Sequence, residues 1–301
     1  MNANPEISII MPTKNGGSLL DRVLTSVYSQ KTDFTYEVVA VDSGSTDNTL
    51  EILKRYPVKL IQIPPTEFSH SKTRNYGATL AGASKYYVFL NQDAIPTDEQ
   101  WLDNLVYSIE FESGLKAVCA TELNERSQVF NVSGVAAFLF KSSLVKGLYI
   151  MEPYLERTWS ELPKYMIRQM FPFTTVCAIF DKEHFDANPF DERTVWGEDL
   201  HWAVHNSRAG YKSGCSSFAR VYHYHDYTDK QMADITSKSN VLFRELFDLE
   251  FNDDVALLMS GSTDAKMPSS IEFMMKLQQS FVWKMIQPMF PVYNYFRKYR
   301  N

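Results

Sequence analysis

The chain has 301 residues, 45% of them hydrophobic, which is typical of a globular protein with a large buried core. Its formal net charge of -6 argues against a general nucleic-acid-binding protein, because such proteins need a positively charged surface. The first six residues do not resemble a signal peptide, and no uninterrupted apolar stretch reaches the roughly 18 residues of a membrane span. The three cysteines are widely spaced, so we expect reduced, buried thiols and a cytoplasmic protein.

Strand and helix signals alternate through the first third of the chain. Apolar runs predict strands at residues 7–11, 37–41, 58–63 and 86–90, and amphipathic segments predict helices at residues 19–30, 49–55 and 71–81. This alternation is typical of a parallel sheet. Polar clusters follow three of the strands, at residues 12–15, 42–43 and 91–93. Because the carboxyl ends of parallel strands meet at one edge, we expect a ligand site there.

Asp93 ends its strand at a turn shortly before Pro96. A carboxylate in this position can hold Mg²⁺ or Mn²⁺, and such ions bridge the oxygens of a diphosphate. An isolated Asp near a proline is more often a simple turn residue. The expected convergence with Asp42 favours the cation site.

The second half of the chain is less regular. Strand-like segments at residues 173–180 and 217–224, a loop at 191–198 and a helix at 199–209 predict a mixed architecture. Glu198 and Asp199 stand where the helix begins, directly after Gly197. One of these carboxylates could act as a general base, although acidic residues in a first turn often only complement the helix dipole.

Two further groups of polar residues could contact a ligand. His223 and His225 alternate on a strand-like run, so either could bind a metal or a phosphate, whereas most lone histidines are packed or surface residues. Residues 68–75 place basic and hydroxyl groups at a helix start, which suits either a phosphate or a solvated first turn. The chain has no Gly-x-Gly-x-x-Gly and no Gly-Lys-Ser/Thr loop, which disfavours dehydrogenases and nucleotide hydrolases.

Together these motifs resemble the inverting family 2 glycosyltransferases of GT-A fold, and most closely bacterial rhamnosyltransferases. The resemblance extends from residue 7 to about residue 246, and its motifs lie at residues 9–16, 41–47, 68–77, 89–94, 197–202 and 221–227. It implies an α/β fold, with a Rossmann-like, mostly parallel sheet, helices on both faces and a C-terminal helical extension. It also implies a nucleotide-sugar-binding half at residues 1–117, an acceptor-binding and catalytic half at 118–227 and an extension at 228–301.

The same resemblance implies a reaction and its residues. The chain would move L-rhamnose from dTDP-L-rhamnose to a saccharide or lipid-linked saccharide acceptor in bacterial surface polysaccharide synthesis. The implied donor-binding residues are Pro12, Thr13, Asn15, Asp42, Ser43, Ser45, Arg74, Gln92 and Asp93. Asp199 would deprotonate the acceptor, Glu198 would orient it, and the acceptor site would comprise Trp196, Gly197 and Glu198.

The implied metal site combines Asp93 with His223 or His225 and would hold Mg²⁺ or Mn²⁺. Imidazole ligands lean toward Mn²⁺. Gln92 stands where many relatives carry a first aspartate, so a single carboxylate would face the cation. We therefore expect weak metal affinity.

Two alternatives remain beside this hypothesis, and a third, a nucleotidyltransferase, is disfavoured. The chain could use a UDP-sugar or another nucleotide-sugar donor. A noncatalytic sugar-nucleotide- or glycan-binding protein would keep Asp42 and Asp93 but would need neither Glu198 nor Asp199. A nucleotidyltransferase would need a glycine-rich, basic first loop, which residues 12–15 do not form.

The segment after residue 227 predicts helices. Thr228 and Gln231 have capping-box spacing ahead of an apolar helix, and a second helix is expected from Ser270 to near Pro288. Residues 293–300 interleave aromatic and positively charged side chains, as interfacial membrane anchors do. The extension could therefore attach the protein to the inner face of the cell membrane, pack on the catalytic domain or form a homodimer.

Overall fold

A single mixed β-sheet organises the described part of the computed structural model, which comprises residues 4–82, 85–123, 147–151, 172–223, 225 and 227–247. Its strands are β1 (Ile7–Thr13), β2 (Tyr36–Asp42), β3 (Val58–Gln62), β4 (Tyr86–Leu90), β5 (Ile95–Pro96), β6 (Leu115–Leu123), β7 (Leu148–Met151), β8 (Cys177–Asp181) and β9 (Lys212–Tyr222). Strands β1 and β4 are buried along nearly their whole length, as expected of apolar runs inside an α/β sheet. The four strands predicted in the first third are thus confirmed.

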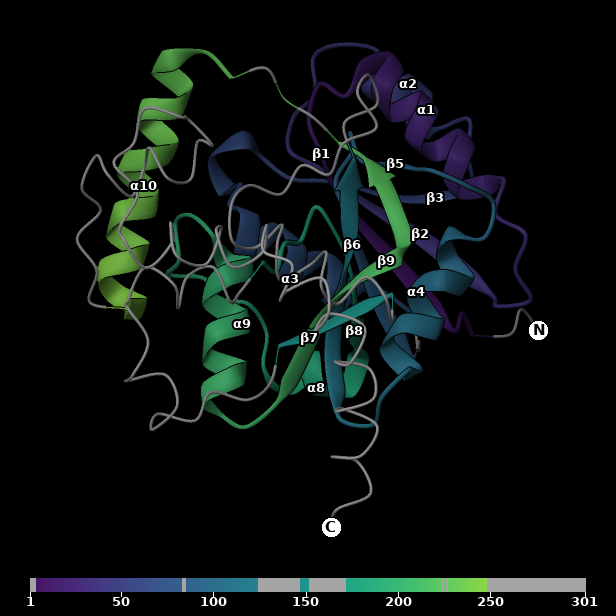
Figure 1. Ribbon diagram of the computed structural model, residues 1–301. Coiled ribbons are helices and arrows are strands. Elements are labelled where there is room, and N and C mark those ends of the chain that lie inside the picture. Colours follow the sequence, from purple (N-terminus) through teal and green to yellow (C-terminus); the bar gives the residue numbers. More distant parts are fainter. Residues whose placement is uncertain are drawn as a thin grey trace, which may run out of the picture. The chain divides into compact units, whose positions relative to one another are not determined.

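Helices cover both faces of this sheet (Figure 1). They are α1 (Gly17–Tyr28), α2 (Thr49–Leu53), α3 (His70–Leu80), α4 (Trp101–Glu110), α8 (Lys182–Ala187), α9 (Glu198–Arg208) and α10 (Asp229–Phe247), with a 3-10 turn at Pro65–Glu67. Side chains alternate along β1, so that Ile9 and Met11 pack with α1, α2 and α4, while Ile10 packs with α3, α8, α9 and α10. Each face of the sheet therefore has its own apolar core.

The strand order is β3-β2-β1-β4-β8-β6-β9-β5, with β7 also paired to β9. Strands β3, β2, β1 and β4 are parallel, whereas β8 is antiparallel to both of its neighbours, β4 and β6. Because β8 reverses the direction twice, β6 and its parallel partner β9 run the same way as β1 and β4. The prediction of a mostly parallel α/β sheet is confirmed, with β5, β7 and β8 as its antiparallel strands.

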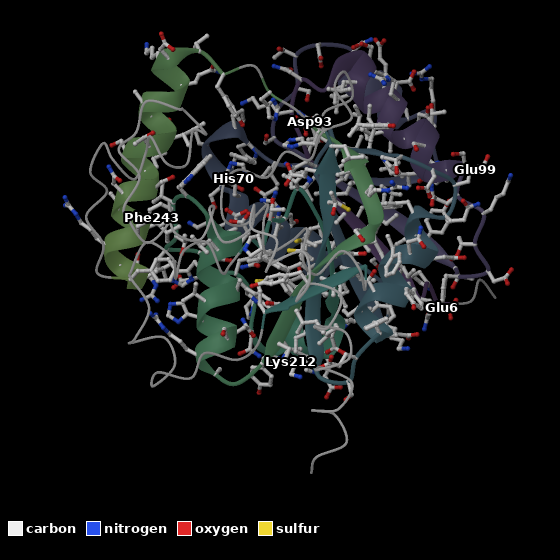
Figure 2. The ribbon with its side chains drawn as sticks, viewed as in Figure 1. Glu6, His70, Asp93, Glu99, Lys212 and Phe243 are labelled. Carbon is white, nitrogen blue, oxygen red and sulfur yellow. The ribbon has the colours of Figure 1, made fainter. Side chains whose placement is uncertain are left out.

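This topology brings the carboxyl ends of β1, β2, β4, β6 and β9 to one edge of the sheet. Figure 2 shows Glu6, just before β1, and Lys212, at the start of β9, in the lower half of the view, and Asp93 in the upper half. The chain enters β8 at this same edge, because β8 runs in the opposite direction. Helix α9 also begins there, since Asp199 in its first turn accepts a hydrogen bond from the backbone N–H of Thr175, just before β8. Residues from both halves of the sequence can therefore contribute to one site.

Helix α3 lies close against this sheet because it carries Gly77 where it crosses β1 and β2. A Cβ atom at this position would lie 2.6 Å from Cγ2 of Ile10 and 3.3 Å from Cγ2 of Val41. The helix begins after Ser69, whose hydroxyl accepts a hydrogen bond from the backbone N–H of Lys72 at 3.1 Å. The N-cap fixes the residue at which α3 begins, and the close packing of Gly77 holds the helix against β1 and β2.

The predicted capping box is confirmed at the start of α10. The backbone N–H of Thr228 donates to Oε1 of Gln231 at 2.9 Å, and the backbone N–H of Gln231 donates to Oγ1 of Thr228 at 3.4 Å. Leu242 and Leu246 are buried on this apolar helix, whereas Val241 is 68% exposed.

Several expectations fall on other parts of the chain. The helix after Ser270 and the aromatic and basic residues 293–300 lie outside the described residues, as does most of the region 122–168. The predicted division at residues 117 and 227 stays a prediction. None of the described helices combines the length and the apolar character that crossing a membrane requires.

Candidate active site

The loops after β1 and β2 are held together by the carboxylate of Asp42, which is fully buried. Its Oδ2 accepts a hydrogen bond from Oγ1 of Thr13 at 3.2 Å and another from the hydroxyl of Ser45, and its Oδ1 accepts the backbone N–H of Ser45 at 2.9 Å. Ser43 donates from its backbone N–H to the carbonyl of Thr13 at 3.0 Å. Asp42 thus holds the turn that carries Ser43 and Ser45 against Thr13 at the end of β1.

Two further side chains, those of Asn15 and Gln92, connect the loops at this edge of the sheet. Asn15 lies in the left-handed region with φ of 48°, and its Oδ1 accepts the backbone N–H of Thr46 at 2.8 Å. Gln92 contacts Lys14 twice, because its Oε1 accepts the backbone N–H and its Nε2 donates to the carbonyl, both at 2.9 Å. The residue at the expected place of a first aspartate therefore joins the loops after β1 and β4.

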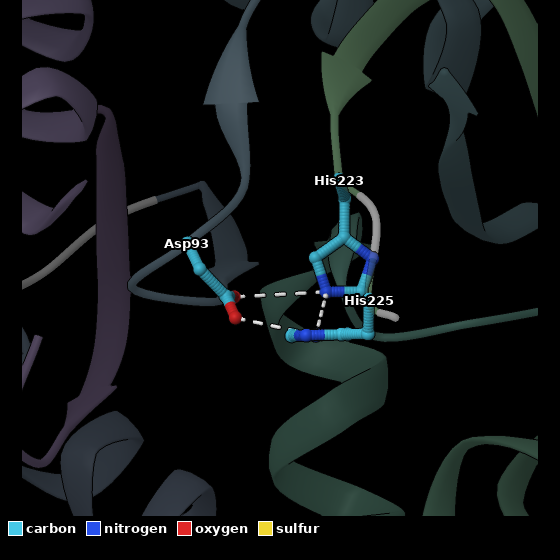
Figure 3. A group of neighbouring side chains, drawn as sticks. All are labelled: Asp93, His223 and His225. Carbon is cyan, nitrogen blue, oxygen red and sulfur yellow. Dashed lines mark hydrogen bonds and ion pairs between the residues drawn. The ribbon is translucent and has the colours of Figure 1, made fainter. Parts of the chain in front are cut away.

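Asp93, His223 and His225 form a cluster in which all three side chains point toward one another (Figure 3). The two Nε2 atoms are 3.0 Å apart, and Asp93 approaches Nε2 of His225 at 3.3 Å and Nε2 of His223 at 3.6 Å. Neighbouring ligands of an octahedral ion, each about 2.1 Å from it, lie about 3 Å apart. The geometry and the donor atoms therefore fit one divalent cation held by both histidines and Asp93.

Glu122, at the end of β6, supports this cluster from behind. Its Oε2 lies 2.8 Å from Nδ1 of His223, so the ring donates from Nδ1 and turns its Nε2 toward Asp93. Burial lowers the pKa of His223, but the hydrogen bond and charge of Glu122 and the charge of Asp93 raise it by more. Sequence reasoning missed Glu122, since its role depends on the pairing of β6 with β9.

A second acidic group lies at the start of α9. Gly197 precedes this helix with φ of 70°, a left-handed conformation that glycine adopts without strain, and a Cβ there would lie 2.5 Å from Cδ2 of Leu242. Glu198 is 5% exposed and forms an ion pair with Nη1 of Arg74 at 2.8 Å. Its Oε1 also accepts a hydrogen bond from Oγ1 of Thr175 at 3.2 Å. Arg74 and Thr175 therefore hold the Glu198 side chain in a buried place.

Asp199 lies beside this pair, and its electrostatic surroundings differ. Burial and the negative charge of Glu198 raise the pKa of Asp199 to about 6, although hydrogen bonds from the backbone N–H groups of Leu200 and Thr175 act in the opposite direction. Its side chain remains partly exposed. A carboxylate of this kind exchanges protons near neutral pH and can act as a general base.

An aromatic wall, formed by Phe68, His70 and Trp196, adjoins the acidic pair. The rings of Phe68 and His70 are 5.2 Å apart, and those of His70 and Trp196 are 6.4 Å apart, both edge to face. Nε1 of Trp196 donates to the hydroxyl of Ser239 on α10 at 3.3 Å. The wall has the apolar faces and polar tips that suit a sugar ring.

Comparison with known proteins now assigns a family to this arrangement. The model of the family described as glycosyl transferase family 2 matches residues 8–180. The chain belongs to glycosyltransferase family 2. It is therefore a glycosyltransferase.

Curated relatives of this glycosyltransferase include two O-antigen chain rhamnosyltransferases. WbaN of Salmonella anatum is 29% identical over 236 residues, which cover 75% of this chain and 69% of the relative. RfbN of Salmonella typhimurium is 28% identical over 227 residues, which cover 75% of this chain and 68% of the relative.

Solved structures of similar fold show the GT-A-like architecture. The mannosyltransferase PcManGT of Pyrobaculum calidifontis, in complex with GDP-Man and Mn²⁺, superposes with a TM-score of 0.53 at 16% identity, covering 96% of this chain and 84% of the other. Staphylococcus aureus TarS 1-349, in complex with UDP-GlcNAc, gives 0.56 at 19% identity, covering 81% of this chain and 68% of the other. At these identities the likeness shows the fold alone.

Proposed function

We propose that this glycosyltransferase transfers L-rhamnose from dTDP-L-rhamnose to a saccharide acceptor, with inversion at the anomeric carbon, in the synthesis of a bacterial surface polysaccharide. The observation that carries the proposal is the carboxyl group of Asp199, whose pKa is raised to about 6 at the sheet edge where ligands bind. The rhamnosyl assignment is supported by the two curated relatives at 29% and 28% identity.

In the proposed reaction, Asp199 removes the proton from the acceptor hydroxyl as its oxygen attacks the anomeric carbon. The bond from that carbon to the nucleoside diphosphate breaks in the same step, so a single displacement inverts the configuration. Glu198 pairs with Arg74 at 2.8 Å, and the charge of Glu198 helps to raise the pKa of the base, while the charge of Arg74 lowers it by less. A base whose pKa lies near the working pH accelerates such a step by roughly 100-fold to 10,000-fold.

On the donor side, we propose that the braced loops bind the nucleotide. Residues 12–15 and 42–45 would contact the nucleoside, with Gln92 at the junction of the loops. Asp93, His223 and His225 would hold Mn²⁺ or Mg²⁺, and the bound ion would supply positive charge to the diphosphate leaving group. The two imidazole ligands favour Mn²⁺ over Mg²⁺.

On the acceptor side, Trp196, Gly197 and Glu198 border the base. We propose that the acceptor sugar packs on the ring of Trp196, which lies between His70 and Ser239. A lipid-linked saccharide is the proposed acceptor class. A noncatalytic binding protein would have no use for a carboxylate of raised pKa beside the ligand site.

Calorimetry with dTDP-L-rhamnose and with UDP-glucose, each with and without Mn²⁺, tests the donor assignment. Tight, metal-assisted binding of the thymidine donor alone is the expected result. Preference for the uridine donor would overturn the sugar assignment and retain the mechanism. Binding of neither donor would contradict the proposed reaction.

A further inference from the structure

Arg74 occupies an unusual position between the acidic pair and the metal cluster. It projects from the second turn of α3, and it is only 3% exposed. Nη1 donates to Oε1 of Glu198 at 2.8 Å, and Nη2 donates to Oδ1 of Asn91 at 2.8 Å. The two arms of one guanidinium thus reach two different segments of the sheet edge.

Each of these segments carries a functional residue nearby. Asn91 precedes Asp93 by two positions, and its own backbone N–H donates to the carbonyl of Val176 at 2.8 Å. Glu198 directly precedes Asp199, and Thr175 contacts both acids, through Oγ1 to Glu198 and through its backbone N–H to Asp199, each at 3.2 Å. Arg74 therefore joins the Asp93 loop to the start of α9 directly, beside the connection that runs through Thr175 and Val176.

The arrangement is better suited to positioning than to stabilising the fold. A buried ion pair contributes little net stability, because the desolvation of two charges offsets their attraction. In addition, Nε of Arg74 has no hydrogen-bond partner among the described residues, which is a further cost of burial. What arginine supplies here is a rigid, planar fork that holds two acceptors at a set separation, and lysine cannot reproduce it.

We propose that Arg74 is a positioning residue that keeps the base-bearing start of α9 in register with the Asp93 loop, through Glu198 and Asn91 respectively. This inference rests on the proposed function, in which Asp199 is the base and Asp93 a metal ligand. Arg74 thereby sets the distance between the group that activates the acceptor and the ion that assists departure of the diphosphate. Such a residue acts through others, and its loss misaligns both ends of the displacement.

A double-mutant cycle with charge-conserving substitutions tests this inference. Arg74→Lys keeps the positive charge but cannot reach Glu198 and Asn91 together, and Asn91→Ala removes the other end of the same link. We expect each single variant to weaken Mn²⁺ binding by about 10-fold in calorimetry. The double variant should bind Mn²⁺ no more weakly than either single variant, because both substitutions cut one connection.

Kinetics supply a second readout. At saturating Mn²⁺, Arg74→Lys should lower kcat by about 100-fold and leave the KM for the donor nearly unchanged, because the base is misaligned while the nucleotide loops stay intact. Tyr76→Phe, on the exposed side of the same helix, is the matched control and should change neither quantity. Thermal unfolding of every variant shows whether the fold is retained, and Asn91→Ala leaves the Arg74 and Glu198 ion pair in place.

Additive losses of Mn²⁺ affinity in the double variant would overturn the inference, since Arg74 and Asn91 would then act separately. A raised donor KM with unchanged kcat and Mn²⁺ affinity in Arg74→Lys would overturn it as well, by placing Arg74 on the donor. Absence of Mn²⁺ binding in the unsubstituted protein would also contradict it. If the unsubstituted protein transferred no sugar, the proposed function would fail, whereas the calorimetric cycle would still decide whether Arg74 and Asn91 form one link.

Discussion

Two acidic groups lie at the same edge of the sheet, and their surroundings give them different chemistry. Asp199 has another carboxylate, Glu198, beside it, and burial together with that negative charge raises its pKa to about 6. Asp93 instead faces two imidazoles, with His225 at 3.3 Å and His223 at 3.6 Å. A crowded pair of acids suits proton transfer, whereas a carboxylate that faces two imidazole rings suits a cation.

The largest effect that separates these groups is expected from Asp199→Asn. The substitution removes the base and keeps the shape, so kcat should fall about 1,000-fold in an assay of product formation. Mn²⁺ affinity, measured by calorimetry, should stay the same because the substituted side chain is not one of the metal-cluster ligands. A loss smaller than tenfold in kcat would place the base elsewhere.

Substitution at the other acid should give the opposite pattern. Asp93→Ala removes the one carboxylate of the metal cluster, so Mn²⁺ affinity should fall by about 100-fold or more. Addition of a chelator to the unsubstituted protein should abolish transfer as well. The comparison would fail if transfer by Asp93→Ala kept the Mn²⁺ dependence of the unsubstituted protein.

Glu122→Gln tests a residue that contacts the metal cluster through His223 without belonging to it. Loss of the carboxylate behind His223 weakens the control of its ring orientation, and Mn²⁺ affinity should fall by about 10-fold. Glu51→Gln, on the exposed side of α2, is the matched control. Equal affinities of the two variants would show that Glu122 does not support the metal site.

The pH dependence of transfer should report the acidic pair. Because Asp199 must be ionised to accept a proton, kcat should decrease about tenfold for each pH unit below pH 6. Glu198→Gln removes the neighbouring negative charge, so the pKa of Asp199 should fall and the acidic limb should move to lower pH. If the acidic limb of the kcat profile stays at the same pH in Glu198→Gln, Glu198 does not raise the pKa of Asp199.

The smallest effect concerns stability. The pKa of Asp199 is higher in the folded chain than its ordinary value of 3.8, so ionisation of Asp199 destabilises the folded protein progressively from about pH 4 to pH 6 and fully above pH 6. Asp199→Asn should therefore raise the free energy of unfolding by about 1 kcal/mol at pH 7, after allowance for partial exposure. Urea denaturation should show this gain shrinking as the pH falls below 6 and disappearing below about pH 4, where both states bind the proton.

The acidic pair and the metal cluster also differ in how much of each the sequence predicts. The apolar run before Asp93 predicts a strand end, and the position of Glu198 and Asp199 at a helix start is confirmed, since α9 begins at Glu198. The roles proposed for these residues stay predictions. The sequence leaves the choice between His223 and His225 open, and the structure places both imidazoles within one cluster.

Residues that act through distant partners could not be found in this way. Glu122 lies 101 positions from His223, and Arg74 lies 124 positions from Glu198. No local pattern marks either contact, because each depends on the order of strands in the sheet. Sequence reasoning placed Arg74 near the donor on the basis of resemblance, and this stays a prediction; the contacts of its guanidinium with Glu198 and Asn91 came only from the structure.

By itself, the sequence determined the α/β architecture and the edge at which the site would lie, because apolar runs and the polar residues that end them are local properties of the chain. Only the tertiary structure decided which of those polar residues meet. The antiparallel strand β8 restores the direction of β6 and β9, and this brings Glu122 and His223 to the edge that β4 and Asp93 already share. Burial and Glu198 raise the pKa of Asp199 to about 6, whereas Asp93 at the same edge faces His223 and His225, because the surroundings of a carboxyl group depend on its neighbours in space.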